Sequence, residues 1–124
     1  MPLKAIDHVQ LAMPPNEEDR ARAFYGQVLG LAEQPKPPNL AQRGGVWFER
    51  GALKVHLGVE EEFRPAQKAH PAFVVEGLQA ILEHCRRDGY KVVYDEPLEG
   101  YERAYVHDPF GNRIELMEPK PGER

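Results

Sequence analysis

The chain has 124 residues, 41% of them hydrophobic and 29% charged, with a formal net charge of −4, which suits one globular domain with its own core. It has no apolar run long enough to span a membrane, no signal-peptide hydrophobic region at the N-terminus, and no basic run of the kind that binds nucleic acid or anionic membranes. A single cysteine, Cys85, excludes an intrachain disulfide, and we expect a cytoplasmic protein with neither nucleic acid nor membrane as partner.

The first half of the chain predicts one amphipathic helix among four strands. Asn16 is a good N-cap, an apolar stripe follows at helical spacing, and Gly30 stands where a glycine usually ends a helix. The proline-rich stretch 35–39 reads as a loop, because proline removes ladder donors from a strand. The expected strands are 4–13, 31–34, 45–50 and 53–59, the last two joined by a tight turn over Gly51.

The second half repeats this order. Leu78, Ile81, Leu82 and Cys85 form a second helical stripe, which stops at Asp88-Gly89. The expected strands are 70–76, 91–94, 103–107 and 113–118, and a turn-forming string, Asp-Pro-Phe-Gly-Asn, joins the last two.

Strand, helix and three strands therefore occur twice, at an offset of roughly sixty residues. This order predicts an α+β fold built from two βαβββ modules, about 4–59 and 69–118, within a single domain, 1–124. Because each strand shows one apolar face, we expect the helices to cover that face of each sheet.

Three histidines and a glutamate occupy equivalent places in the two modules. His8 lies in the first strand of module one and His70 opens the first strand of module two. His56 lies in the last strand of module one, and Glu115 holds the same place in module two.

Strand parity strengthens the pattern. In the strand of His56 the apolar pair Val55 and Leu57 points to the opposite face, and the same holds for each of the other three strands. Four polar side chains thus share the face away from the helices.

Imidazole and carboxylate ligands suit Zn, Ni, Mn, Fe or Co, and open positions would remain for water or substrate. Taken singly, each of these residues is more often structural or solvated than a ligand. We predict a divalent metal ion held by His8, His56, His70 and Glu115, and we do not expect His84 or His107 to be ligands. Trp47 fits a core position slightly better than a place in the cavity.

Four stretches carry a resemblance to a known family. They are Ile6-Asp7-His8-Val9, the segment 23–31 (AFYGQVLGL), the segment 70–75 (HPAFVV) and the segment 108–116 (DPFGNRIEL). Together they resemble the vicinal-oxygen-chelate superfamily, which includes glyoxalase I, fosfomycin-resistance enzymes, extradiol dioxygenases and metal-free bleomycin-binding proteins. The last stretch is the most specific, and the resemblance covers nearly the whole chain.

The resemblance implies paired βαβββ modules that form an open cup around a metal, with ligands from the first and last strands of each module. Those positions match His8, His56, His70 and Glu115. It also implies a metal-dependent enzyme, a lyase, isomerase, transferase or dioxygenase, that acts on a small substrate chelated through neighbouring oxygens. The alternative is a metal-free binding or sequestering protein of the bleomycin-resistance type.

Two departures from the family's patterns affect the reaction. Glyoxalase I usually has a glutamate where this chain has His56, and imidazole is a different base. The loop at 96–101 lacks the lysine and serine that fosfomycin transferases place around a phosphonate.

Arg103 and Tyr105 share a strand face and are candidate catalytic residues. Arg103 or Lys54 would orient an anionic group and Tyr105 would donate a hydrogen bond, although ordinary cross-strand packing explains the pair equally well. Relatives of this length also imply a homodimer in which His8 and His56 of one chain meet His70 and Glu115 of the other.

Overall fold

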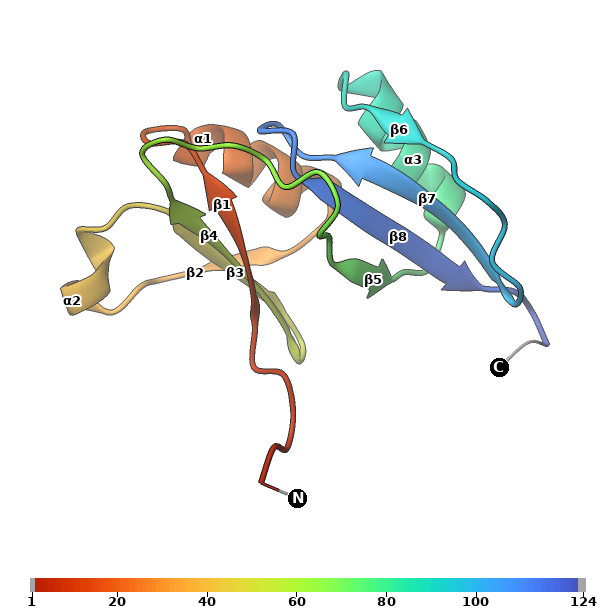
Figure 1. Ribbon diagram of the computed structural model, residues 1–124, viewed down its shortest axis with the longest axis horizontal. Helices are drawn as coiled ribbons and strands as arrows, with labels where there is room; N and C mark the ends of the chain where they lie inside the picture. Colours follow the sequence, from red (N-terminus) through yellow and green to blue (C-terminus); the bar gives the residue numbers. More distant parts are fainter. Residues whose placement is uncertain (1, 123–124) are drawn as a thin grey trace. The chain divides into compact units, whose positions relative to one another are not determined.

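A computed structural model describes residues 2–122 of the chain. It divides into two compact units, the first ending at Arg64 and the second beginning at Pro65. Each unit contains one four-stranded sheet and its own helices (Figure 1). The α+β fold class and the open sheets of two βαβββ modules are therefore confirmed.

The first unit has the strand order β1-β4-β3-β2, in which β1 runs parallel to β4 and the other neighbours are antiparallel. Its elements are β1 (Val9–Met13), α1 (Glu18–Ala21), the π-helix η1 (Arg22–Val28), β2 (Ala32–Gln34), α2 (Pro38–Ala41), β3 (Val46–Arg50) and β4 (Leu53–Val59).

The second unit has the equivalent order, β5-β8-β7-β6, again with one parallel pair, β5 and β8. Its elements are β5 (Ala72–Val74), α3 (Leu78–Arg87), β6 (Val92–Val93), β7 (Tyr101–His107) and β8 (Arg113–Pro119). The repeat predicted from element order thus extends to strand pairing and direction.

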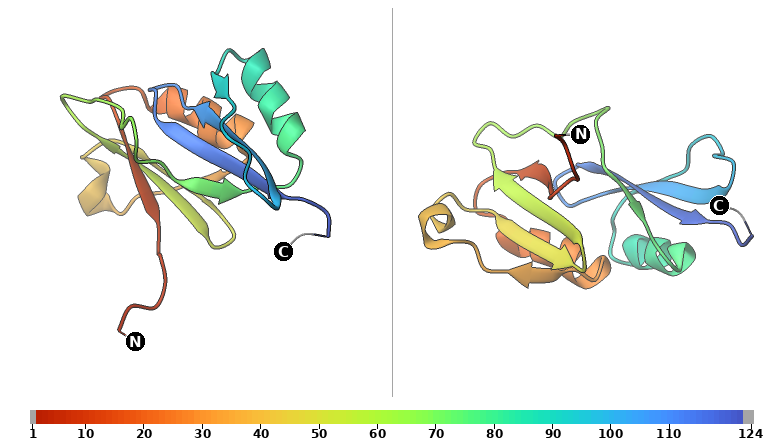
Figure 2. Two further views of the ribbon diagram at one scale, coloured as in Figure 1. Left: turned by 45° about the vertical axis from the view of Figure 1, so that its right-hand side comes forward. Right: turned by 90° about the horizontal axis from the view of Figure 1, so that it is seen from below.

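Each sheet buries one face against a helix of its own unit. In the first unit η1 contacts β2 and β3, and in the second unit α3 contacts β6, β7 and β8 (Figure 2). Val55 and Leu57 are buried beside His56, and Ile114 and Leu116 are buried beside Glu115. The alternation expected from strand parity is present, so the candidate ligands lie on the faces away from these helices.

The first helix differs from the expectation in its start and in its type. Asn16 is not the N-cap: it has a positive φ of 64°, and Glu17 precedes the first helical residue. After one α-helical turn the chain widens into η1, whose buried residues are Phe24, Tyr25 and Val28. Leu29 N–H bonds to the Phe24 carbonyl, a spacing of five residues that defines the π form.

Some other boundaries were also wrong. Prolines predicted a loop over 35–39, but Pro38 begins the short helix α2, where a missing N–H costs nothing. Strands β1 and β5 are shorter than expected, so His8 and His70 lie just before them rather than inside them.

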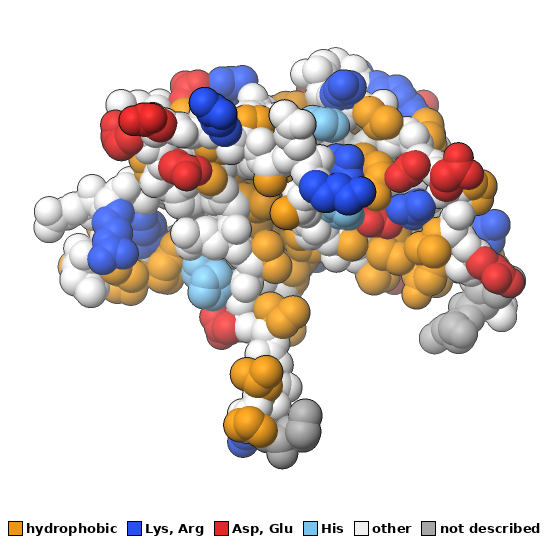
Figure 3. Space-filling view, in the orientation of Figure 1, with side chains coloured by type: hydrophobic (Ala, Val, Ile, Leu, Met, Phe, Trp, Pro, Cys, Tyr) orange, Lys and Arg blue, Asp and Glu red, His pale blue; other side chains and the backbone are white. Residues whose placement is uncertain are grey.

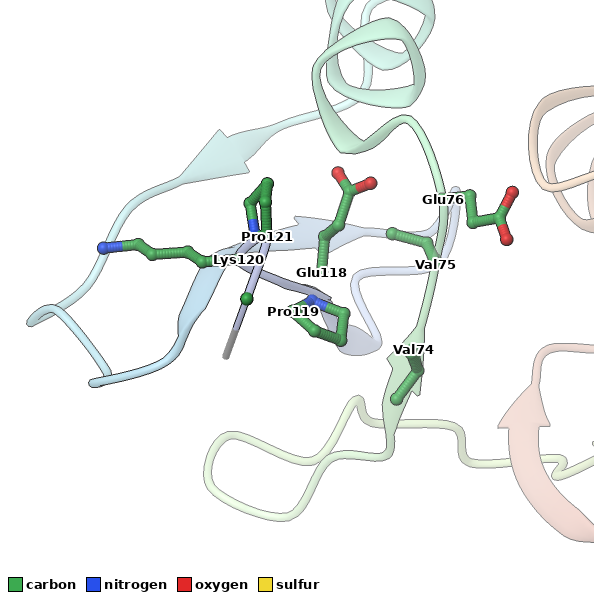
Figure 4. A pocket seen from close by; sticks show the side chains of 8 residues that line it. Val74, Val75, Glu76, Glu118, Pro119, Lys120 and Pro121 are labelled. Carbon is green, nitrogen blue, oxygen red and sulfur yellow. The ribbon is translucent and has the colours of Figure 1, made fainter. Parts of the chain in front are cut away.

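A carboxylate caps α3 from another part of the second unit. The Glu118 side chain on β8 accepts hydrogen bonds from the N–H groups of Gly77 and Leu78, both at 3.0 Å. In Figure 4 this carboxylate points toward the first turn of the helix, whereas that of Glu76 points away from it. These hydrogen bonds lower the pKa of Glu118 below its usual value of 4.5.

Asp108 organises the turn between β7 and β8. Its buried carboxylate accepts hydrogen bonds from the N–H groups of Phe110 and Asn112, both at 2.9 Å, and from the Asn112 side chain at 2.8 Å. This turn fixes the register that places His107 opposite Arg113. None of the helices in the described part of the chain has the length and apolar character needed to cross a membrane.

Candidate functional site

In the first unit two aromatic rings, those of Trp47 and His8, stack on the His56 ring. The Trp47 ring lies 4.1 Å from the His56 ring at an interplanar angle of 5°, and the His8 ring lies 4.1 Å from it on a 19° angle. Antiparallel pairing of β3 with β4 sets Trp47 directly opposite His56. The expectation of a core tryptophan is therefore wrong: Trp47 is partly exposed and lies on the face of the candidate ligands.

His56 is buried, whereas its neighbour His8 is exposed. Burial, followed by the nearby His8, lowers the pKa of His56 below its usual value of 6.5. His56 is consequently a neutral imidazole at neutral pH, the form that ligates metals. His8 is held by Asp7, whose carboxylate lies 3.0 Å from Nδ1, and Lys54 lies 3.5 Å from the other oxygen of Asp7.

The second unit brings His70 and Glu115 together. His70 Nε2 lies 3.1 Å from Glu115 Oε1, and His70 Nδ1 lies 3.0 Å from the backbone oxygen of Lys68. The Lys68 contact fixes the ring and leaves Nε2 directed at the carboxylate. The Tyr105 ring meets the His70 ring edge-on, with centroids 5.0 Å apart.

Arg103 donates a hydrogen bond to the other carboxylate oxygen of Glu115. Its Nη1 lies 3.2 Å from Glu115 Oε2 and 3.3 Å from the Tyr105 hydroxyl, and its second terminal nitrogen donates to the Glu96 carbonyl. The guanidinium is thus committed to the carboxylate and the backbone. In this arrangement it orients Glu115 rather than offering its charge to a separate anion.

The donor atoms of His70 and Glu115 fit a shared metal ion in spacing. Two ligands that are each roughly 2.1 Å from one ion lie about 3.0–3.4 Å apart, and this pair is 3.1 Å apart, which also suits an ordinary hydrogen bond. Between residues 2 and 122 no three His, Cys, Asp or Glu side chains converge in metal-binding geometry. The structure therefore shows two pairs, His8 with His56 and His70 with Glu115.

His84 and Cys85 lie on α3, outside the candidate site. His84 lies 3.2 Å from Asp88 in an i, i+4 pair on α3. Cys85 is fully buried, and burial raises the pKa of its thiol to about 11, which makes it unreactive at neutral pH.

The role of Trp47 beside His56 is the feature that sequence reasoning missed. A signal for it existed. A two-residue turn, Gly51-Ala52, pairs Arg50 with Leu53. Counting back along both strands from that pair places Trp47 opposite His56.

Comparison with known proteins gives consistent results for the chain. The model of the glyoxalase/bleomycin resistance protein/dioxygenase superfamily matches residues 5–116. The chain is 47% identical to a glyoxalase family protein from Bacillus anthracis, with a TM-score of 0.88 over 95% of this chain and 97% of that one. A comparison with curated protein sequences gave no match.

Two more distant structures share the fold. A glyoxalase/dioxygenase from Nostoc punctiforme is 21% identical, with a TM-score of 0.77 over 96% of this chain and 93% of that one. The fosfomycin resistance protein FosX from Listeria monocytogenes is 16% identical, with a TM-score of 0.74 over 98% of this chain and 96% of that one.

Proposed function

We propose a function from one premise: the chain belongs to the glyoxalase/bleomycin resistance protein/dioxygenase superfamily. Within it, the protein is a metal-dependent enzyme that acts on a small molecule through two neighbouring oxygen atoms. His8, His56, His70 and Glu115 hold one divalent ion, which would be Zn, Ni, Mn, Fe or Co.

The observation that carries this proposal is the facing pair of His70 and Glu115. Their donor atoms have the spacing of two ligands, and each is held from behind, His70 by the Lys68 carbonyl and Glu115 by Arg103. Supported ligands of this kind are typical of metal sites. The lowered pKa of His56 favours the neutral imidazole and supports its role as a third ligand.

When bound, the ion acts as a Lewis acid on the chelated oxygens of the substrate. Arg103 and Tyr105 are the residues proposed to act beside it. Arg103 keeps the Glu115 carboxylate oriented, and the Tyr105 hydroxyl, 3.3 Å from Arg103, donates a hydrogen bond to a substrate oxygen. Trp47 and Tyr105 supply aromatic surface near the two ligand pairs.

We also propose a homodimer whose sites are shared, with His8 and His56 of one chain joining His70 and Glu115 of the other. Large apolar side chains are exposed in both units: Leu3 at 87%, Ile6 at 82% and Val74 at 69%. Exposed apolar side chains of this size favour coverage by a second subunit.

A second candidate function is a metal-free binding protein for a small molecule. It is favoured by one observation, that within residues 2–122 no three potential ligating side chains converge. Such a protein would use the aromatic and polar surface around Trp47 and Tyr105 without a metal.

Elemental mass spectrometry on untagged protein purified without chelator tests the first candidate. We expect about one metal ion per chain, and its loss from His70→Ala and Glu115→Ala. His84→Ala, which changes a histidine on α3, is the matched control and should retain the metal. Protein that neither contains metal nor takes up nickel, manganese, zinc or iron would instead be the metal-free binding protein.

A further inference from the structure

A basic pocket of about 330 Å³ opens in the second unit. Its lining includes Gln67, Lys91, Val93, Tyr105, His107 and Arg113. Lys and Arg side chains lie beside histidines over the part of the molecule where β7 and β8 run (Figure 3). This pocket was not anticipated, since the expected anion-binding groups were Arg103 and Lys54.

Strand register places the pocket on the same sheet face as Glu115. His107 pairs with Arg113, and the His107 N–H bonds to the Lys91 carbonyl, so these three residues form one row across the sheet. The adjacent row on the same face contains Val93, Tyr105 and Glu115. Tyr105 therefore belongs both to the pocket lining and to the surroundings of Glu115.

Lys91 and Arg113 give the lining of the pocket positive charge, and the nearest acids lie outside the lining: Asp108 beside His107, and Glu115 in the adjacent row. No Asp or Glu lines the pocket, and in the described residues neither Lys91 nor Arg113 forms an ion pair. The contrast with Arg103 is clear, because that guanidinium already bonds to Glu115. A lysine and an arginine that form no ion pair in one concave site attract anions.

Arg113 is oriented for binding. Its guanidinium carbon lies over the Tyr105 ring, 4.4 Å from the ring centroid, a cation–π contact that restrains the side chain at the pocket. Its Nε, like that of Arg103, is buried and lacks a hydrogen-bond partner among the described residues. A buried donor without a partner is costly, and an acceptor delivered by a ligand would satisfy it.

We propose that Lys91, His107 and Arg113 bind the carboxylate or phosphate group of a small organic anion, whose apolar part lies against Val93 and Tyr105. Rows two residues apart along a strand are separated by roughly 7 Å. A ligand whose anionic group lies at Arg113 would therefore reach Glu115 with its metal-chelating oxygens only if a short carbon skeleton joins the anionic group to those oxygens. The use of this pocket by the substrate rests on the proposed metal function, whereas anion binding itself does not.

The test uses the full chain, treated with chelator and then dialysed, so that metal does not bind the probes. Inorganic phosphate and benzoate are titrated separately by calorimetry and by imidazole NMR. We expect saturable binding of at least one probe, with shifts at His107, and the tighter probe identifies the class of anion. Arg113→Gln and Lys91→Gln should each weaken binding about tenfold.

Arg87→Gln is the matched control, because it removes the same charge from the exposed face of α3 and should leave binding unchanged. Arg113→Lys, which keeps the charge, should retain part of the affinity if Arg113→Gln loses it. Thermal melts establish that each variant is folded, and the exposed Lys91 gives a variant whose folding is not at risk.

Metal measurements separate this inference from the proposed function. Binding of an anion by protein that takes up no metal would support the anion pocket and contradict the proposed metal-dependent enzyme. Metal uptake without saturable anion binding, or equal anion binding by wild type, Arg113→Gln and Lys91→Gln, overturns the pocket and leaves the metal site standing.

Discussion

Two arginines on one sheet face have different partners, and this difference divides their roles. Arg103 bonds to Glu115 and to the Glu96 carbonyl, whereas Arg113 lies closer to the Tyr105 ring, at 4.4 Å against 5.9 Å, and pairs with no carboxylate in the described residues. A guanidinium bound to a carboxylate has its charge largely compensated, while one that lies over a ring retains its donors. The first arginine positions a protein group, and the second is available to a ligand.

His107 should titrate below pH 6.5. Burial, reinforced by Lys91, lowers its pKa from that usual value. Between the pKa of His107 in the folded protein and 6.5, the unfolded chain binds more protons than the folded protein. The contribution of His107 to folding stability is therefore complete above pH 6.5. It is lost as the pH falls through the pKa of the folded state.

Imidazole NMR in a buffer free of phosphate and carboxylates measures this midpoint, with His107→Asn assigning the signal. Urea melts between pH 7 and pH 5 should show a shallower loss of stability for His107→Asn than for wild type. A His107 midpoint at or above 6.5 would contradict the burial argument.

At the scale of elements, hairpin register was the most predictable feature and helix form the least. Alternation placed Val55 and Leu57 on the buried face, and His56 and Glu115 on the other, because a two-residue period has no competing geometry in a strand. The widening of the first helix into the π-helix η1 could not be predicted, because the spacing of its apolar residues suits α and π turns alike. The His56–Trp47 stack follows from the register of one hairpin, whereas the His70–Glu115 pair needed parallel neighbours forty-five residues apart, which no local pattern encodes.

Two glycines of the first unit should respond in opposite directions to alanine. Gly26 lies within η1 at a negative φ, and a β-carbon there would meet only the Leu31 carbonyl, at 3.8 Å. Gly45 has a φ of +88°, and its β-carbon would collide with the Leu57 carbonyl on the neighbouring strand.

Gly26→Ala is therefore expected to stabilise the protein by about 0.5–1 kcal/mol, the usual gain from replacing glycine inside a helix. Gly45→Ala is expected to destabilise it by about 1–3 kcal/mol from backbone strain alone. Urea denaturation of the two variants beside wild type measures both changes. Equal effects of the two substitutions would contradict the conformations described for these glycines.

At the scale of the whole molecule, each unit carries half of the proposed ligand set. The first unit supplies His8 and His56, and the second supplies His70 and Glu115. Because each pair lies within one unit, one pair can be removed without touching the other. The repeated topology was predictable from element order, but the chain that completes each site is not encoded in any local pattern.

Mixing of two double variants tests the shared homodimer. His8→Ala/His56→Ala and His70→Ala/Glu115→Ala should each bind no metal alone. After co-refolding, a mixed dimer would hold one intact site, formed by the unaltered halves of both chains, so that the mixture regains up to about a quarter of the wild-type metal content. Light scattering should report a dimer throughout, and a monomer that binds metal tightly would contradict this assembly.

Trp47 is the only tryptophan of the chain, and its indole lies parallel to the His56 ring at 4.1 Å. All tryptophan fluorescence of this protein therefore comes from an indole that contacts one candidate ligand, His56. Protonation of that imidazole, or its coordination of a paramagnetic ion such as nickel or cobalt, would quench the emission directly. The protein thus carries its own unlabelled optical probe, through which the occupancy of the site can be followed in real time by ordinary fluorescence.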